Sequence, residues 1–322
     1  MTTAIVGDTR QATAIARHWI DGRWRDSAEH KDSINPATGE VIGRYALAGE
    51  DEAREATAAA LRAFRETTWK NDRVLRSRVL HELAERFEAH AADLIQLMSI
   101  ENGKVVPEAT FEVGMAAPGL RYYGALGLTE YGRVAEWEPG HFSLLVREPI
   151  GVAGISVPWN SPVALLIRSL APALASGCTT VVKMPGETAQ LNALIGELIS
   201  EVTSLPPGVV NIVTGGREVL SFLVKSPDVP TISFTGSTQV GRAISQAGAA
   251  RLKRFGLELG GKTPMLVFDD ADLDAALPKL ERRISELEQL ATSQGRELRI
   301  QFERIAQLQG EWDILRIRFI KS

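Results

Sequence analysis

Cysteine is almost absent from this 322-residue sequence, which contains Cys178 and no other. A single cysteine excludes an internal disulfide framework and fits a chain that works in the reducing cytoplasm. Long hydrophobic runs are also missing. The first residues lack the apolar stretch of a signal peptide, and no run approaches the roughly 18 apolar residues of a membrane span. We therefore expect a soluble, cytoplasmic protein with no membrane partner.

Patterns that would indicate a nucleic-acid or metal site are missing too. The net charge of −4 and the pI near 5.9 give no basic footprint, so no nucleic-acid partner is expected. The five histidines show no metal-ligand spacing, which argues against a zinc site. The dinucleotide fingerprint GxGxxG is absent, so any case for nucleotide binding has to come from other residues.

A strand–helix–strand unit between Gly151 and Glu187 is the clearest feature that the sequence does contain. Residues 151–157 form a short apolar run closed by a proline, which ends a strand because proline cannot donate to the ladder. Ser161, followed by proline, predicts a helix start with serine as the N-cap, and Gly177 predicts the helix end. The β-branched residues 179–182 predict a second strand, buried on both faces.

The flanking sequence repeats this alternation. A hairpin is predicted at Trp19–Trp24, helices over 50–100 and 111–131, and an extended segment at 142–147. Beyond Glu187, the predicted elements are helices at 191–202 and 220–224, strands at 209–213 and 231–234, and a helix that begins near Ser237. This order indicates an α/β fold with a doubly wound, Rossmann-like parallel sheet and helices on both faces. Glu101, near a glycine-marked helix end, is interpreted as part of a capped surface helix.

The last 43 residues have a different pattern. From Leu280, mostly apolar residues recur at alternating spacings of four and three over more than five heptads, which is typical of a coiled coil. An amphipathic helix packed on its own domain is the alternative interpretation. We predict three parts: a coenzyme-binding domain over 1–257, a catalytic-domain remnant over 258–279 that includes a strand at 263–268, and a coiled-coil-like helical tail over 280–322.

Four short sequence motifs resemble those of a known family. They are Pro158-Trp159-Asn160, Val181-Val182-Lys183, Phe234-Thr235-Gly236-Ser237 and Leu257-Glu258-Leu259-Gly260-Gly261-Lys262. In this order and spacing, the chain resembles the aldehyde dehydrogenase superfamily from near Trp19 to about Leu280. The resemblance implies an NAD- or NADP-dependent oxidation of an aldehyde to an acid, with a small-molecule aldehyde as substrate. It also implies a homo-oligomer.

The resemblance implies a set of coenzyme contacts in this chain. They are Val157, Trp159, Lys183, Glu187, Gly216, Ser237, Val240 and Leu259. The physical case rests on Thr235–Ser237, where a strand ends and a helix begins, so that free amides and a positive dipole end can face a pyrophosphate. A plain N-cap serine is the alternative interpretation of Ser237.

The residues at the adenosine ribose depart from the family pattern. The family uses the lysine at position 183 on this ribose, and often has a glutamate three residues later that favours NAD over NADP. This chain has Gly186 there and Glu187 one position later. A missing carboxylate would lower the charge penalty for a 2′-phosphate, so NAD and NADP both stay open.

Two residues are candidates for the chemistry. Asn160 resembles the family's oxyanion donor, and a simple turn asparagine is the alternative. Glu258 resembles the general base that activates water for thioester hydrolysis. Because a lone buried carboxylate costs several kcal/mol or takes up a proton, a glutamate in this apolar, glycine-rich stretch favours a functional role.

The nucleophile that this chemistry needs has no counterpart in the sequence. Enzymes of the family attack the aldehyde with a cysteine thiolate, which lies some thirty residues beyond the glutamate that Glu258 resembles. Cys178 lies instead at the start of a predicted buried strand, where a small apolar residue is expected. We therefore expect a dehydrogenase truncated before its catalytic cysteine, with impaired turnover. A non-catalytic dinucleotide-binding or coiled-coil assembly module is the alternative, and a gene fragment that folds poorly is a third.

Overall fold

The computed structural model describes residues 15–261, 268, 270–272, 274–275 and 278. The coiled-coil tail predicted from Leu280 and nearly all of the strand predicted at 263–268 lie outside the described residues. Residues up to Gly260 belong to one compact unit, and Gly261 begins a second. The domain boundaries proposed at residues 258 and 280 stay predictions.

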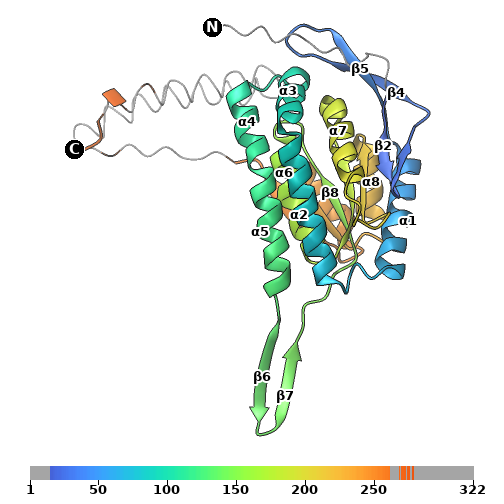
Figure 1. Ribbon diagram of the computed structural model, residues 1–322, viewed down its shortest axis with the longest axis vertical. Helices are drawn as coiled ribbons and strands as arrows, with labels where there is room; N and C mark the ends of the chain where they lie inside the picture. The colour runs from blue at the N-terminus through green and yellow to red at the C-terminus, as the bar shows by residue number, and fades with distance from the viewer. Residues whose placement is uncertain (1–14, 262–267, 269, 273, 276–277, 279–322) are drawn as a thin grey trace. The chain divides into compact units, whose positions relative to one another are not determined.

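A seven-stranded sheet forms the centre of the first unit, in the order β12-β11-β8-β9-β10-β2-β3 (Figure 1). Its strands are β2 (His18–Ile20), β3 (Arg23–Arg25), β8 (Val152–Ser156), β9 (Thr179–Met184), β10 (Val210–Thr214), β11 (Thr231–Gly236) and β12 (Arg254–Leu259). The five strands from β12 to β10 are parallel, but β2 and β3 are antiparallel to their neighbours. The expectation of a parallel sheet is therefore wrong at this edge, because the predicted hairpin at Trp19–Trp24 pairs with β10 and extends the sheet.

Helices cover both faces of this sheet, as the alternating pattern predicts. They are α1 (Glu50–Glu66), α2 (Arg73–Ala89), α3 (Ala91–Asn102), α4 (Val106–Gly114), α5 (Ala116–Thr129), α6 (Pro162–Ala175), α7 (Ala189–Ser200), α8 (Arg217–Lys225) and α9 (Thr238–Ala249). Helices α2 to α7 share one core with Ile155 and Val182, whereas α1, α8 and α9 share a second core with Val181 and Ile232. No described helix is long and apolar enough to cross a membrane.

The strand–helix–strand unit forms where the sequence places it. Both strands are buried almost throughout, and the buried leucines of α6 each contribute roughly 1.5–3 kcal/mol relative to an exposed side chain. Ser161 is the N-cap of α6, but its side chain makes no cap hydrogen bond, contrary to the expected role. Gly177 has a φ of +91°, and a Cβ there would lie 2.7 Å from Cγ of Pro149, so glycine is required at the helix end.

Two small sheets complete the described chain. One has the order β1-β5-β4, with β1 (Ile15–Ala16), β4 (His30–Ile34) and β5 (Val41–Ala46). The other is the hairpin of β6 (Arg133–Glu138) and β7 (His141–Leu145), which projects away from the helices in Figure 1. The β7 strand confirms the extended segment predicted at 142–147.

The strand order reverses next to β8. The chain runs from β8 to β9 and β10 on one side, and then crosses to β11 on the other side of β8. In open α/β sheets, ligands bind beyond the carboxyl ends of the strands at such a switch point. Because Ser156 pairs with Phe234 in register, the chain segments that follow β8 and β11 leave the sheet side by side.

Candidate functional site

The predicted site residues gather at this carboxyl edge. Trp159 and Asn160 follow β8, Lys183 lies near the end of β9, and Ser237 follows β11. Glu258 lies on β12, opposite Thr235 in register. The parallel register therefore brings to one edge residues that are up to 99 positions apart in the sequence.

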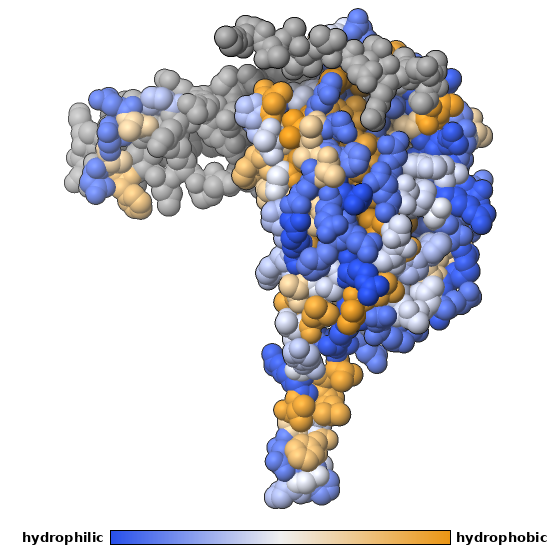
Figure 2. Space-filling model, viewed as in Figure 1, coloured by the Kyte–Doolittle hydropathy of each residue, from blue (hydrophilic) through white to orange (hydrophobic). Residues whose placement is uncertain are grey.

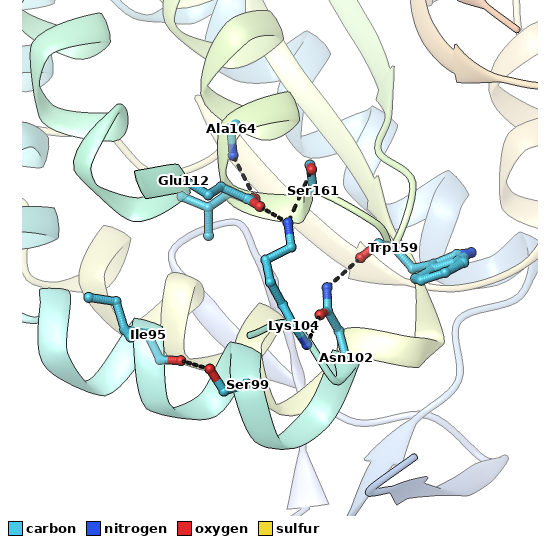
Figure 3. Close-up of polar contacts among 9 residues, drawn as sticks. Ile95, Ser99, Asn102, Lys104, Glu112, Trp159, Ser161 and Ala164 are labelled. Atoms are coloured by element: carbon cyan, nitrogen blue, oxygen red, sulfur yellow. Dashed lines mark hydrogen bonds and ion pairs between the residues drawn. The ribbon is translucent and has the colours of Figure 1, made fainter. Parts of the chain in front are cut away.

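The turn that carries Asn160 is held by the end of α3 and by the segment between α3 and α4 (Figure 3). Asn102 Nδ2 donates to the Trp159 carbonyl oxygen at 2.9 Å, and Lys104 Nζ donates to Ser161 Oγ at 3.2 Å. Lys104 also forms an ion pair with the buried carboxylate of Glu112. Asn160 itself is exposed, and no described residue forms a hydrogen bond with its side chain, so its amide can donate to a ligand oxygen.

Lys183 is a partly desolvated ammonium at the same edge. Burial lowers the pKa of Lys183, while the nearby carboxylate of Glu187 raises it by a smaller amount. Within the described part of the chain, the Lys183 ammonium has no hydrogen-bond partner. A cation in this state gains from an oxygen-rich ligand such as a ribose.

The departure at Gly186 has a local cause. A Cβ at residue 186 would lie 2.5 Å from Tyr45 Oη and 3.1 Å from Tyr45 Cζ, so the tyrosine fills the space of a side chain. Tyr45 is itself buried against Ala16 and Ala189 and cannot easily move. Burial, followed by the charges of Glu187 and Glu101, raises the pKa of Tyr45, so its hydroxyl stays neutral and able to hydrogen bond.

The start of α9 offers backbone amides to solvent. Ser237 is exposed and caps the helix, its Oγ accepting from the backbone N–H of Val240 at 3.3 Å. The side chain of Leu259 packs on the same helix, where a Cβ at Gly241 would lie 2.6 Å from it. At the neighbouring helix α8, the N-cap is Gly216, which has no side chain to accept a hydrogen bond.

Glu258 lies on the α6 face of the sheet but is not buried. Its side chain is 65% exposed, and its Oε2 lies 3.9 Å from Nη2 of Arg168, which also donates to Thr235 Oγ1. The argument from a buried carboxylate is therefore wrong for the described unit, because β12 is the edge strand. An exposed ion pair of this kind contributes about 0–1 kcal/mol. The base role of Glu258 stays a prediction.

Cys178 lies at the opposite edge of the sheet. It immediately precedes β9, whereas the site lies beyond the other end of that strand, about 17 Å away at 3.3 Å per residue. The thiol is 4% exposed and accepts from Ser176 Oγ at 3.5 Å. Its position supports the prediction that Cys178 is a packing residue.

The sequence interpretation missed the burial of two acids. Glu101 is 3% exposed, so its placement on a surface helix is wrong, and Glu112 was not singled out at all although it is 4% exposed. Burial raises the pKa of Glu101 to about 7, against hydrogen bonds from Ser33 and from the backbone of α7 that lower it. The helix-start N–H groups that they bind lie 51 to 90 residues away, so no local pattern could have found these contacts.

A hollow of about 880 Å³ lies along α1 and α8, and its lining includes Arg217, the residue after Gly216. Its lining alternates acids with basic residues, among them Glu50 and Arg54, which pair with each other at 2.5 Å. The volume of this hollow does not by itself identify it as the coenzyme site, because the polar groups that could contact a ligand lie at the switch point.

Comparisons with known proteins identify the family of this chain. The model of the aldehyde dehydrogenase family matches residues 24–286. The chain belongs to the aldehyde dehydrogenase family. It is 41% identical to a mitochondrial succinate-semialdehyde dehydrogenase of Arabidopsis thaliana, over 80% of this chain and 49% of that protein. It is 37% identical to the NADP(+) succinate-semialdehyde dehydrogenase GabD of Escherichia coli, over 83% of this chain and 55% of that protein.

Solved structures show the same fold. HpcC of Thermus thermophilus matches with a TM-score of 0.79 and 36% identity, over 84% of this chain and 53% of that one. Betaine aldehyde dehydrogenase of Staphylococcus aureus, solved in complex with NAD+, matches with a TM-score of 0.78 and 32% identity, over 82% and 53%. The chain thus spans about half the length of the relatives that it matches.

Proposed function

We propose that the chain binds NAD or NADP at the carboxyl edge of its central sheet. The observation that carries the proposal is the exposed amino end of α9 at Ser237, which lies beside the turn that bears Asn160. Amides and dipole charge at such a helix start attract a pyrophosphate. The proposed contacts are Val157, Trp159, Lys183, Glu187, Gly216, Ser237, Val240 and Leu259.

The coenzyme preference is open to both forms. No carboxylate is present at residue 186, where Tyr45 fills the space of a side chain, so nothing at that position repels a 2′-phosphate. Lys183 provides a positive charge within electrostatic range of Glu187. We infer that the site accepts either coenzyme.

Aldehyde oxidation is the activity expected by descent, and we infer that this chain performs it poorly. Asn160 is the proposed donor to the aldehyde oxygen, and Glu258 is the candidate base. The bound coenzyme would supply the hydride acceptor. Cys178 is the chain's only thiol, and it is buried at the far edge, so no thiolate can reach the carbonyl. The cytoplasmic location that the single cysteine favours stays a prediction.

Calorimetric titration tests the coenzyme proposal. NAD+ and NADP+ should each release or absorb heat with a stoichiometry near one, and Ser237→Ala should weaken both titrations. A Cys178→Ala protein should bind as the parent does. Absence of binding by the parent would refute the proposal, and aldehyde oxidation by the Cys178→Ala protein at ordinary enzyme rates would refute the inferred loss of turnover.

A homo-oligomer is the second proposal, and the β6–β7 hairpin favours it. Trp137, Phe142 and Leu144 are each more than 60% exposed, and Figure 2 shows apolar side chains along this hairpin. An isolated two-stranded sheet is marginally stable in water, so a second copy of the chain is a natural partner. Light scattering should give a mass above one chain that falls in a Phe142→Ser, Leu144→Ser protein.

The helical tail provides a separate arm of that test. Deleting residues 280–322 should lower the mass if the tail is a coiled coil that holds copies together. A parent protein that already has the mass of one chain would contradict the assembly proposal. An unchanged oligomer after the deletion would confine assembly to the hairpin.

A further inference from the structure

Helices α6, α7, α8 and α9 each follow a strand of the parallel sheet and begin at its carboxyl edge, and each has backbone N–H groups without an intrahelical acceptor. At α6, these groups are already satisfied. Glu112 Oε1 accepts from the backbone N–H of Val163 at 2.9 Å and of Ala164 at 3.1 Å, as Figure 3 shows for Ala164. Lys104 neutralises the same carboxylate from the other side.

The start of α7 is filled in the same way. Glu101 accepts from the backbone N–H of Gln190 at 2.8 Å through Oε1 and from that of Leu191 at 2.9 Å through Oε2. Ser33 donates a further hydrogen bond to Oε1. A buried carboxylate thus lies where an anion would bind at the amino ends of both α6 and α7.

The other two helix starts contain no such acid. Helix α9 is capped by its own Ser237, and the Gly216 cap of α8 has no side chain. Within the described ranges, no carboxylate from another element accepts from the first N–H groups of α8 or α9. Both ends therefore keep amides that a ligand can use.

We propose that Glu101 and Glu112 are positioning residues and that the Glu112 carboxylate, paired with Lys104, acts as a built-in anion. They occupy the amino ends of α6 and α7, hold the turns before these helices, and leave α8 and α9 to receive the coenzyme pyrophosphate. The proposal rests on the coenzyme site proposed above. On this proposal, Asn102 and Lys104 hold the turn that carries Asn160, and Glu112 holds Lys104 in place.

Removing the Glu112 carboxylate tests this role through anion binding. In Glu112→Ala, two helix N–H groups and the Lys104 ammonium surround an empty space, so inorganic phosphate should bind there. The expected result is that phosphate shifts the amide resonances of Val163 and Ala164 in the variant, but not in the parent. Acetate should compete with phosphate and return these resonances towards their parent positions. A residue that only fills space would give neither response.

Coenzyme affinity provides the second readout. The dissociation constant for NADP+ should rise on the order of tenfold in Glu112→Ala and recover with added acetate, because the Asn160 turn is held again. Glu108→Ala, on the exposed face of the same helix, is the matched control and should bind as the parent does. If Glu112→Ala fails to fold, Glu112→Gln retains an acceptor oxygen without the charge and should weaken NADP+ binding by a smaller factor.

The outcomes separate the two proposals. A parent that binds no coenzyme refutes the proposed function, while the phosphate and acetate responses of Glu112→Ala still decide the built-in anion. Conversely, a folded Glu112→Ala that binds NADP+ like the parent and shows no phosphate response refutes the positioning role. The same holds for Glu112→Gln if its NADP+ affinity equals that of the parent.

Discussion

The two pairs of helix starts at the sheet edge differ in what binds their first amides. Helices α6 and α7 have theirs bound by buried glutamates from α3 and α4, whereas α8 starts at a glycine and α9 is capped only by its own Ser237. The pairs lie on opposite faces: α6 and α7 share a core with α3 and α4, and α8 and α9 share one with α1. Glu101 on α3 and Glu112 on α4 contact helix starts on the α6 and α7 face of the sheet. The comparison teaches that the same fold geometry gives a closed or an open anion site according to what packs behind it.

Removing the Glu112 carboxylate from the start of α6 should have the largest effect on the free energy of unfolding. Glu112→Ala removes two helix hydrogen bonds and leaves Lys104, whose side chain is 12% exposed, without its partner. Loss of one member of a buried pair costs about 3–5 kcal/mol. Denaturant unfolding should show this loss, and Glu108→Ala should stay within about 0.5 kcal/mol of the parent. Equal stabilities for the two variants would contradict the account.

Titration of Glu101, at the start of α7, should give the next largest effect on the free energy of unfolding. Glu101 has a pKa of about 7 in the fold against 4.5 unfolded, so its contribution to stability is present below pH 4.5 and is lost as the pH rises through 7. Buried His18 has the opposite shift, with a pKa of about 4 against 6.5, because burial disfavours its charged form. Its contribution is present above pH 6.5 and is lost as the pH falls through 4. Each shift corresponds to about 3 kcal/mol.

These two contributions nearly cancel between pH 4.5 and 6.5, so single variants should expose them. The unfolding free energy of Glu101→Gln should fall as the pH is lowered from 6.5 to 4, because His18 acts alone. That of His18→Gln should rise as the pH is lowered from 7 to 4.5. Unfolding curves at a series of pH values check both slopes. Variants that retain the pH profile of the parent would rule out these assignments.

The close contact between Gly186 and Tyr45, just before α7, provides a further test of the packing around that helix start. Gly186→Ala places a Cβ against Tyr45 and should lower the unfolding free energy by about 1–3 kcal/mol through overpacking. Removing the hydroxyl with Tyr45→Phe should reduce that penalty. A double-mutant cycle measures the coupling between the two positions. Additive effects would mean that the tyrosine does not fill this space.

The open side should show the smallest effect on stability. Ser237→Ala removes the local cap of α9 and should cost about 1 kcal/mol, while it weakens coenzyme binding. Ser245→Ala, a residue later in the same helix, is the control and should leave coenzyme binding unchanged. Thermal unfolding and NADP+ titration of both proteins provide the two numbers. If Ser245→Ala weakens binding as much as Ser237→Ala does, the cap has no special role.

Local patterns were sufficient for most of the fold. The β-branched run 179–182 and the serine–proline start at Ser161 predicted β9 and α6, and the resemblance predicted which segments meet at the sheet edge. The antiparallel pairing of β2 with β10 was missed because it joins residues nearly 200 positions apart.

The parts of the site that were missed have the same cause. Glu101 lies on α3 but caps the start of α7, so this contact depends on how α3 packs. Glu101 is 89 residues from Gln190, and such a spacing has no local signature. Glu258 was misjudged in the other direction. Its apolar neighbours suggested burial, but an edge strand leaves alternate side chains in solvent.

Amide resonances followed during an NADP+ titration test the difference between the two pairs of helix starts most directly. The account predicts that the largest shifts occur at Gly216, Ser237 and Val240, while Val163, Ala164, Gln190 and Leu191 change little. Shifts that are largest at the starts of α6 or α7, or no shift at any of the four helix starts, would contradict it.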